Sequence, residues 1–121
     1  MTQIASPSIP QSEIESLEQL YTLRERAEVL QFLEKYPFLV PVLLEAPSSI
    51  RQDFPDEPLF IKVVPDPEIV DYVQLVLSIL TTIDPHEAVN RLHHLDKNWL
   101  LNLSHEVRER LCTLLEYPDD F

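Results

Sequence analysis

The sequence predicts an α+β fold: N-terminal helices, then a β-β-α-β unit, with the helices packed on one face of a small, mainly antiparallel three-stranded sheet. Three observations support this. Apolar residues recur every three or four positions early in the chain, β-branched residues gather in its middle, and a well-capped helix separates the last two predicted strands. The length of 121 residues suits one domain, with residues 1–11 as a flexible tail and residues 12–121 as the folded part.

The first helix is predicted to begin at a capping box. In the stretch 12–15, Ser-Glu-Ile-Glu, the Ser12 hydroxyl can accept the N3 amide while Glu15 reaches back to the start of the helix. Apolar residues then recur at helical spacing as far as Pro37: Ile14, Leu17, Leu20, Leu23, Ala27, Leu30 and Leu33. One long helix is therefore expected between Ser12 and Pro37.

Residues 36–55 are rich in leucine, valine and phenylalanine but contain Pro37, Pro41 and Pro47. Proline is tolerated near the first turn of a helix or at a kink. The segment predicts one kinked helix or two short ones, largely buried in the core. The alternative is that residues 37–54 form a hydrophobic groove for a partner.

Two strands are expected next. Residues 59–64 contain three β-branched side chains and end at Pro65, which predicts a strand with Lys62 on its wetter face. Residues 72–82 are predicted to be its antiparallel neighbour. The alternative for residues 72–82 is a helix capped by Asp66 and Pro67, because leucine and valine suit either state in a buried run.

The last third begins with a strong helix start. Asp84 suits the N-cap, Pro85 the first helical position and Glu87 the third, so a helix is predicted over residues 84–101. Residues 104–110 then predict one further helical turn. Residues 110–117 alternate in the way that a closing strand requires.

The histidines of this helix are the first candidates for chemistry, since three of the chain's four lie between Thr82 and Trp99. At 100° per residue, a core stripe forms from Ala88, Leu92, Leu95 and Trp99. No histidine pair has the three- or four-residue spacing that a metal site on one helix needs, so neither metal ligands nor a cofactor is expected. If the helix contacts a partner, the candidates are the residues opposite the core stripe and its terminal tryptophan: His86, Asn90, His93, Lys97 and Trp99.

No catalytic residue is predicted. Cys112 could be a nucleophile with His105 as base and arginines 108 and 110 lowering its pKa, but a cysteine in a strand is more often a small buried hydrophobe. The densest carboxylate groups, around residues 53–57, 66–71 and 119–120, are expected to be solvated turn residues. Two i,i+4 pairs, Glu87 with Arg91 and Glu106 with Arg110, should add little stability.

Charge and composition limit the kinds of partner and ligand that the chain is expected to bind. With 21 acidic and 9 basic residues, the formal net charge of -12 disfavours direct binding to nucleic acid or an anionic membrane and favours a protein with a basic surface. The absence of glycine excludes a P-loop, a dinucleotide fingerprint and an EF-hand. The single cysteine, the lack of a signal peptide and the lack of a long apolar run predict a cytoplasmic location.

Several segments together resemble a group of small uncharacterised proteins common in cyanobacteria. They are F-L-E-K-Y-P-F-L-V-P-V-L-L-E-A, P-L-F-I-K-V-V-P-D-P-E, Q-L-V-L-S-I-L-T, P-H-E-A-V-N-R-L-H-H-L-D-K-N-W and R-L-C-T-L-L-E, between residues 30 and 117. The resemblance implies the α+β fold and an intracellular bacterial setting. It implies no catalytic residue.

These observations favour a non-enzymatic, acidic protein-interaction module of a bacterial cytosol, such as an adaptor, a regulatory subunit or an antitoxin-like inhibitor of a basic protein. One alternative is a small metal-dependent or hydrolytic enzyme whose histidine, aspartate and glutamate residues assemble in space. Another is a structural homo-oligomer joined through a sheet edge, for instance that of the last strand.

Overall fold

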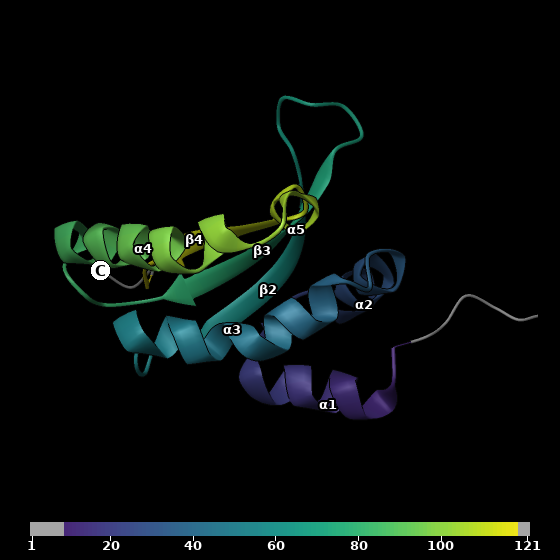
Figure 1. The fold of residues 1–121 in the computed structure, drawn as a ribbon, viewed down its shortest axis with the longest axis horizontal. Helices are drawn as coiled ribbons and strands as arrows, with labels where there is room; N and C mark the ends of the chain where they lie inside the picture. Colours follow the sequence, from purple (N-terminus) through teal and green to yellow (C-terminus); the bar gives the residue numbers. More distant parts are fainter. Residues whose placement is uncertain (1–8, 119–121) are drawn as a thin grey trace, which may run out of the picture.

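The computed structural model describes residues 9–118, and these form an α+β fold with helices packed on a four-stranded sheet (Figure 1). In chain order the elements are α1 (Gln11–Leu20), β1 (Thr22–Leu23), α2 (Arg26–Lys35), α3 (Leu39–Asp53), β2 (Leu59–Pro65), β3 (Val73–Leu80), α4 (Pro85–Asn98), the 3-10 turn η1 (Leu100–Asn102), α5 (His105–Arg108) and β4 (Leu111–Glu116).

The strands lie in the order β1-β2-β3-β4. β2 and β3 form an antiparallel hairpin, whereas β1 is parallel to β2 and β4 is parallel to β3. The prediction of a mainly antiparallel three-stranded sheet is therefore wrong in strand number and direction. The helix between β3 and β4 is the reason for the second parallel pair, because a crossover of this length returns the chain to the end where β3 began.

The predicted single helix over residues 12–36 is interrupted. Residues 21–25 leave the helical path, Thr22 and Leu23 pair with β2, and Glu25 adopts a left-handed conformation with φ of 52°. The Tyr21 hydroxyl donates a 2.6 Å hydrogen bond to the buried carbonyl of Leu43. Burial of Tyr21 in this contact and the β-pairing of Thr22 override the helical periodicity that continues through this segment.

The first helix also begins differently from the prediction. Pro10 occupies the N-cap position and its carbonyl accepts the amide of Ile14, while no side chain caps the helix. Ser12 already lies inside α1. Ile9 belongs to the core, and the remaining residues of the predicted tail, 1–8, lie outside the described residues.

The proline-containing segment 36–55 forms one helix, α3. Pro41 lies in its first turn, where no amide donor is needed, and Pro47 lies inside it. Five of its side chains are buried in the core: Leu39, Val40, Leu43, Ala46 and Ile50. The prediction of one helix that packs in the core is confirmed, but only one face of the helix is buried, so it is not largely buried as expected.

Four other predictions agree with the structure. Residues 59–64 and 72–82 lie in the antiparallel pair β2 and β3, residues 84–101 lie mostly in α4, and β4 falls within residues 110–117. On α4, Ala88 and Leu95 are buried while Leu92 and Trp99 are half-buried against the core. The apolar stripe predicted from the sequence is thus the face of α4 that packs against the core.

The core lies on one face of the sheet. Alternate strand residues, including Ile61, Leu77 and Leu111, share one hydrophobic cluster with buried residues of α1 to α5. The opposite face, here called the open face, carries Phe60, Lys62, Val64, Gln74, Val76, Ser78, Leu80, Cys112, Leu114 and Glu116. Within residues 9–118, no helix combines the length and apolar character needed to cross a membrane.

Candidate functional site

Acidic side chains converge where α3 ends, β3 ends and α4 begins. The five carboxylates of this region, here called the acidic end, are Asp53, Asp56, Glu57, Asp84 and Glu87. They come from two separate stretches of sequence. The hairpin register brings the stretches together, because Leu59 at the start of β2 pairs with Ile79 near the end of β3.

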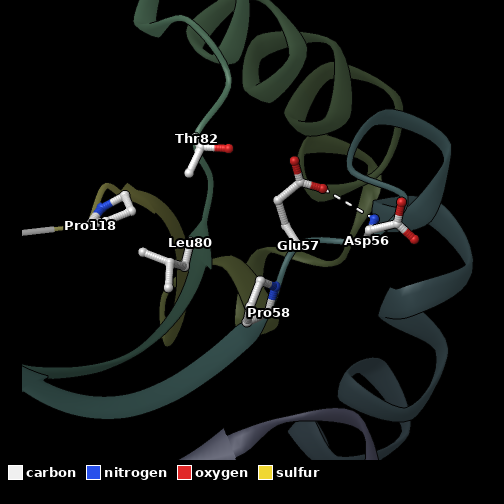
Figure 2. A pocket seen from close by; sticks show the side chains of 6 residues that line it. All are labelled: Asp56, Glu57, Pro58, Leu80, Thr82 and Pro118. Atoms are coloured by element: carbon white, nitrogen blue, oxygen red, sulfur yellow. Dashed lines mark hydrogen bonds between the residues drawn. The ribbon is translucent and has the colours of Figure 1, made fainter.

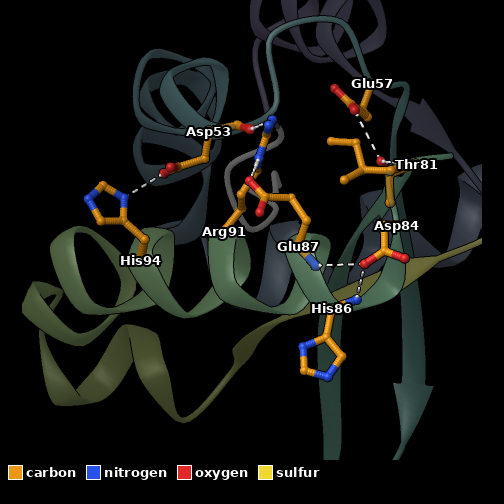
Figure 3. Close-up of polar contacts among 9 residues, drawn as sticks. Asp53, Glu57, Thr81, Asp84, His86, Glu87, Arg91 and His94 are labelled. Carbon is orange, nitrogen blue, oxygen red and sulfur yellow. Dashed lines mark hydrogen bonds and ion pairs between the residues drawn. The ribbon is translucent and has the colours of Figure 1, made fainter.

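Asp53 ties the last turn of α3 to α4. Its carboxylate lies 3.0 Å from Nδ1 of His94, and its backbone carbonyl accepts a 3.0 Å hydrogen bond from Arg91 (Figure 3). Arg91 also donates to Glu87 at 2.9 Å, which confirms that predicted pair. The Asp53 side chain is only 15% exposed, so the prediction that the carboxylates of residues 53–57 are simply solvated is wrong for Asp53.

Glu57 and Thr81 form the second link. The Thr81 hydroxyl donates to Glu57 at 3.1 Å and accepts the amide of Ile83 at 3.0 Å (Figure 3). A hydroxyl beside a carboxylate is a feature of some nucleophilic sites. Thr81, however, is 1% exposed and is engaged as both donor and acceptor, so its hydroxyl stabilises the turn before α4.

Asp84 is the N-cap of α4, as predicted. Its carboxylate accepts the amides of His86 at 3.1 Å and Glu87 at 3.4 Å. Pro85 occupies the first helical position, where it needs no amide donor. The local sequence therefore fixes both the start of α4 and the position of two carboxylates.

An open pocket of about 330 Å³ lies beside these carboxylates. Its lining residues are Asp56, Glu57, Pro58, Leu80, Thr82 and Pro118. In Figure 2, Leu80 and Pro118 lie on one side and the two carboxylates on the other. A pocket with carboxylates on one side and apolar groups on the other suits a lysine or arginine side chain, whose methylene stem packs on apolar groups while its charged head reaches the acids.

The basic residues do little to neutralise this pocket. Among residues 9–118, no lysine or arginine forms an ion pair with Asp56, Glu57 or Asp84. Arg51 is nearby, but its guanidinium donates to the backbone carbonyls of Phe54 and Glu57. The acidic end therefore keeps an excess of negative charge.

The predicted contact residues of α4 divide into two groups. His86, Asn90, His93 and Lys97 are exposed, as the helical stripe requires, and His86 and Asn90 line a shallow hollow of about 290 Å³ with Pro85 and Val89. Trp99 is different, because it is half-buried against the core.

Cys112 lies on β4 but is only half-buried. Burial raises the pKa of its thiol, and the negative charge of Asp96 adds to the effect. The two arginines expected near this thiol are engaged elsewhere: Arg108 donates to the carbonyl of Leu103, and Arg110 donates to that of Val73 and stacks over two tyrosine rings. The Arg110 contact also replaces the predicted pair with Glu106.

Within the described residues, no group of three or more histidine, cysteine, aspartate or glutamate side chains has the geometry to hold a metal ion. His105 and Glu109 do approach to 3.2 Å, but they form an exposed pair on one short helix. Two ligands do not make a site.

Sequence reasoning identified Asp56 and Glu57 as an acidic turn but did not predict the pocket. Its other wall comes from Leu80 and Pro118, which reach it through the hairpin register and the parallel placement of β4. No family model, no curated protein and no solved structure matches the chain.

Proposed function

We propose that this chain is a non-enzymatic interaction module that binds a basic segment of another protein at its acidic end. The pocket beside Asp56 and Glu57 supports the proposal most directly. Two residues whose carboxylates have no lysine or arginine ion-pair partner in residues 9–118 line this pocket together with Leu80 and Pro118. The Glu57 carboxylate accepts hydrogen bonds only from the amide of Asp56 and the hydroxyl of Thr81, so it carries a charge that no cation of these residues pairs. A lysine or arginine side chain of the partner supplies what this arrangement lacks.

The charge of the whole chain supports the same partner. A net charge of -12 steers a basic surface towards the molecule and disfavours binding to polyanions. All six arginines donate hydrogen bonds within the chain, so they are less available for binding phosphate. An adaptor, a regulatory subunit or an inhibitor of a basic protein each fits this chemistry.

The test begins with purification of the tagged full chain from its own host at about 0.05 M salt, followed by a wash at about 0.5 M, a range over which screening weakens exposed charge contacts. Mass spectrometry of the washed fraction should identify a stoichiometric protein with a basic segment. Binding of that segment is then measured by titration calorimetry for two charge-matched double variants.

The variant Asp56→Asn with Glu57→Gln should weaken binding by about tenfold, the effect of roughly 1.4 kcal/mol. The control Glu28→Gln with Glu34→Gln removes the same charge from exposed positions on α2 and should weaken binding much less. Equal weakening by both double variants would place the contact elsewhere. Binding that does not change with salt would reject charge recognition itself.

A further inference from the structure

β4 is an edge strand whose outer side has no partner in residues 9–118. The amide of Leu75 donates to the carbonyl of Arg110, and the amide of Thr81 donates to that of Glu116. In a parallel ladder, alternate residues direct their backbone groups towards the neighbouring strand. The even-numbered residues of β4 therefore face β3, and the N–H and C=O groups of Leu111, Thr113 and Leu115 point outwards.

This edge lacks the features that usually prevent pairing. Residues 111–115 contain no charged side chain and no proline, whereas natural edge strands are commonly protected by lysine, proline, a bulge or shortness. The opposite edge of the sheet is protected by shortness, because β1 has only two residues. Leu114, on the open face of β4, is 50% exposed.

We propose that two copies of this chain pair through β4, antiparallel, about a twofold axis at Thr113, so that their sheets become one. The outward groups fall into register in this arrangement. Leu111 lies opposite Leu115 of the second copy, and Thr113 lies opposite its own equivalent. Each of these pairs exchanges two N–H···O bonds, about six hydrogen bonds in all.

The side chains are also self-complementary. Cys112 lies opposite Leu114 of the second copy, so two partly exposed apolar groups cover each other on the open face. At the two ends of the strand, Arg110 lies opposite Glu116. Each of these side chains is already engaged within its own chain, Arg110 with the carbonyl of Val73 and Glu116 with Arg24. The arrangement therefore brings no like charges together, which would oppose pairing.

The charge distribution favours antiparallel over parallel pairing of two copies. Glu116 lies beside the acidic end, because its carbonyl accepts the amide of Thr81 just before Asp84 and α4. Parallel pairing would bring two acidic ends together. Antiparallel pairing places them at opposite ends of the joined sheet, where their repulsion is weaker. The pairing does not rest on the function proposed above.

Disulfide trapping tests the register. Cys112 and Leu114 of the second copy form a non-hydrogen-bonded pair, in which Cα atoms are about 4.5 Å apart, within the range that disulfides span. Under mild oxidation, Leu114→Cys should convert the 14.1 kDa chain to a covalent species of twice that mass. Peptide mapping should identify a link between positions 112 and 114 of different chains.

Two controls make the trapping specific. In the unmodified chain, and in Leu114→Cys combined with Cys112→Ala, the nearest cysteines of two copies are diagonal neighbours about 7–8 Å apart. Both should stay monomeric after denaturation under the same oxidation. Equal cross-linking in the double variant would mean random collision and would overturn the register.

Light scattering across a dilution series tests the association without cross-links. The unmodified chain should show twice the monomer mass, and Leu114→Lys should show the monomer mass, because a charge on this strand opposes pairing. The matched control is Val70→Lys, at an 86% exposed position in the loop between β2 and β3, and it should remain a dimer. A monomer at every concentration, together with no trapping of Leu114→Cys, would overturn the proposal.

Discussion

At the scale of single residues, the contact between Arg24 and Glu116 covers part of the open face, where no helix of residues 9–118 packs. The guanidinium donates two hydrogen bonds to the carboxylate, at 2.6 and 2.8 Å, and its carbon lies 4.1 Å from the centre of the Phe60 ring. Arg24 follows the first strand of the sheet and Glu116 lies on the last, so the pair links the two edges. Between these edges, Ser78 of β3 also lies on the open face and is only 3% exposed, so this part of the face is covered.

The pair should make stability depend on pH. Hydrogen bonding from Arg24 holds the pKa of the Glu116 carboxyl below its usual range. The contribution of this ion pair to the free energy of unfolding is therefore complete above about pH 5, where the carboxyl of the unfolded chain is also ionised. It is lost as the pH falls through the lowered pKa of the folded state. Glu116→Gln should reduce the free energy of unfolding by about 1 kcal/mol at pH 7, since both side chains are partly exposed.

Urea denaturation at pH 7 and near pH 3 measures this effect, and the difference between the original chain and Glu116→Gln should shrink at the lower pH. The control is Glu18→Gln, which removes the more exposed pair with Arg26 and should lower the free energy of unfolding much less. An equal loss from both variants at pH 7 would show that the Arg24 contact is an ordinary surface pair.

This residue-scale feature could not be predicted from the sequence. Arg24 and Glu116 are 92 positions apart. Arg24 lies within a segment that reads as continuous helix until the pairing of β1 with β2 is known. The exposure of the histidines of α4, in contrast, could be predicted. His86 and His93 lie opposite the core stripe of the helix, and the position of that stripe follows from the spacing of its own apolar residues.

At the scale of elements, the two predicted helix starts have opposite outcomes. Asp84 caps α4 through two amides, whereas the Ser12 side chain does not cap α1. Asp84→Ala should therefore lower the free energy of unfolding by about 1 kcal/mol, and Ser12→Ala should change it by no more than a few tenths. Thermal unfolding followed by circular dichroism measures both; a cost for Ser12→Ala equal to that for Asp84→Ala would contradict the observed start of α1.

The local rules succeed where an element is defined by its own residues. Asp84, Pro85 and Glu87 suffice to start α4, and the β-branched run of β2 suffices for a strand. They fail at Tyr21, where the decisive contact is a hydrogen bond to the backbone of α3. Tertiary contacts override propensity there, as they do for the unpredicted strand β1.

At the scale of the whole molecule, the layered arrangement was predictable but the sheet topology was not. Burial on one face follows from alternation within each strand, and the helices supply the matching apolar stripes. The strand order depends on crossovers whose direction no single segment specifies. The pocket at the acidic end could not be predicted for the same reason, because Leu80 and Pro118 become its wall only once β4 lies parallel to β3.

The shared core predicts how the molecule unfolds. One hydrophobic cluster contains residues from Ile9 to Leu111, including Tyr21 and Leu43 from the N-terminal half and Leu77 and Leu95 from the C-terminal half. The N-terminal helices therefore have no separate core on which to remain folded. Urea unfolding followed by Trp99 fluorescence, which reports on α4, should coincide with that followed by far-ultraviolet circular dichroism, which reports on all helices. Two separated midpoints would show that α1 to α3 form an independent unit despite sharing their buried surface with the sheet.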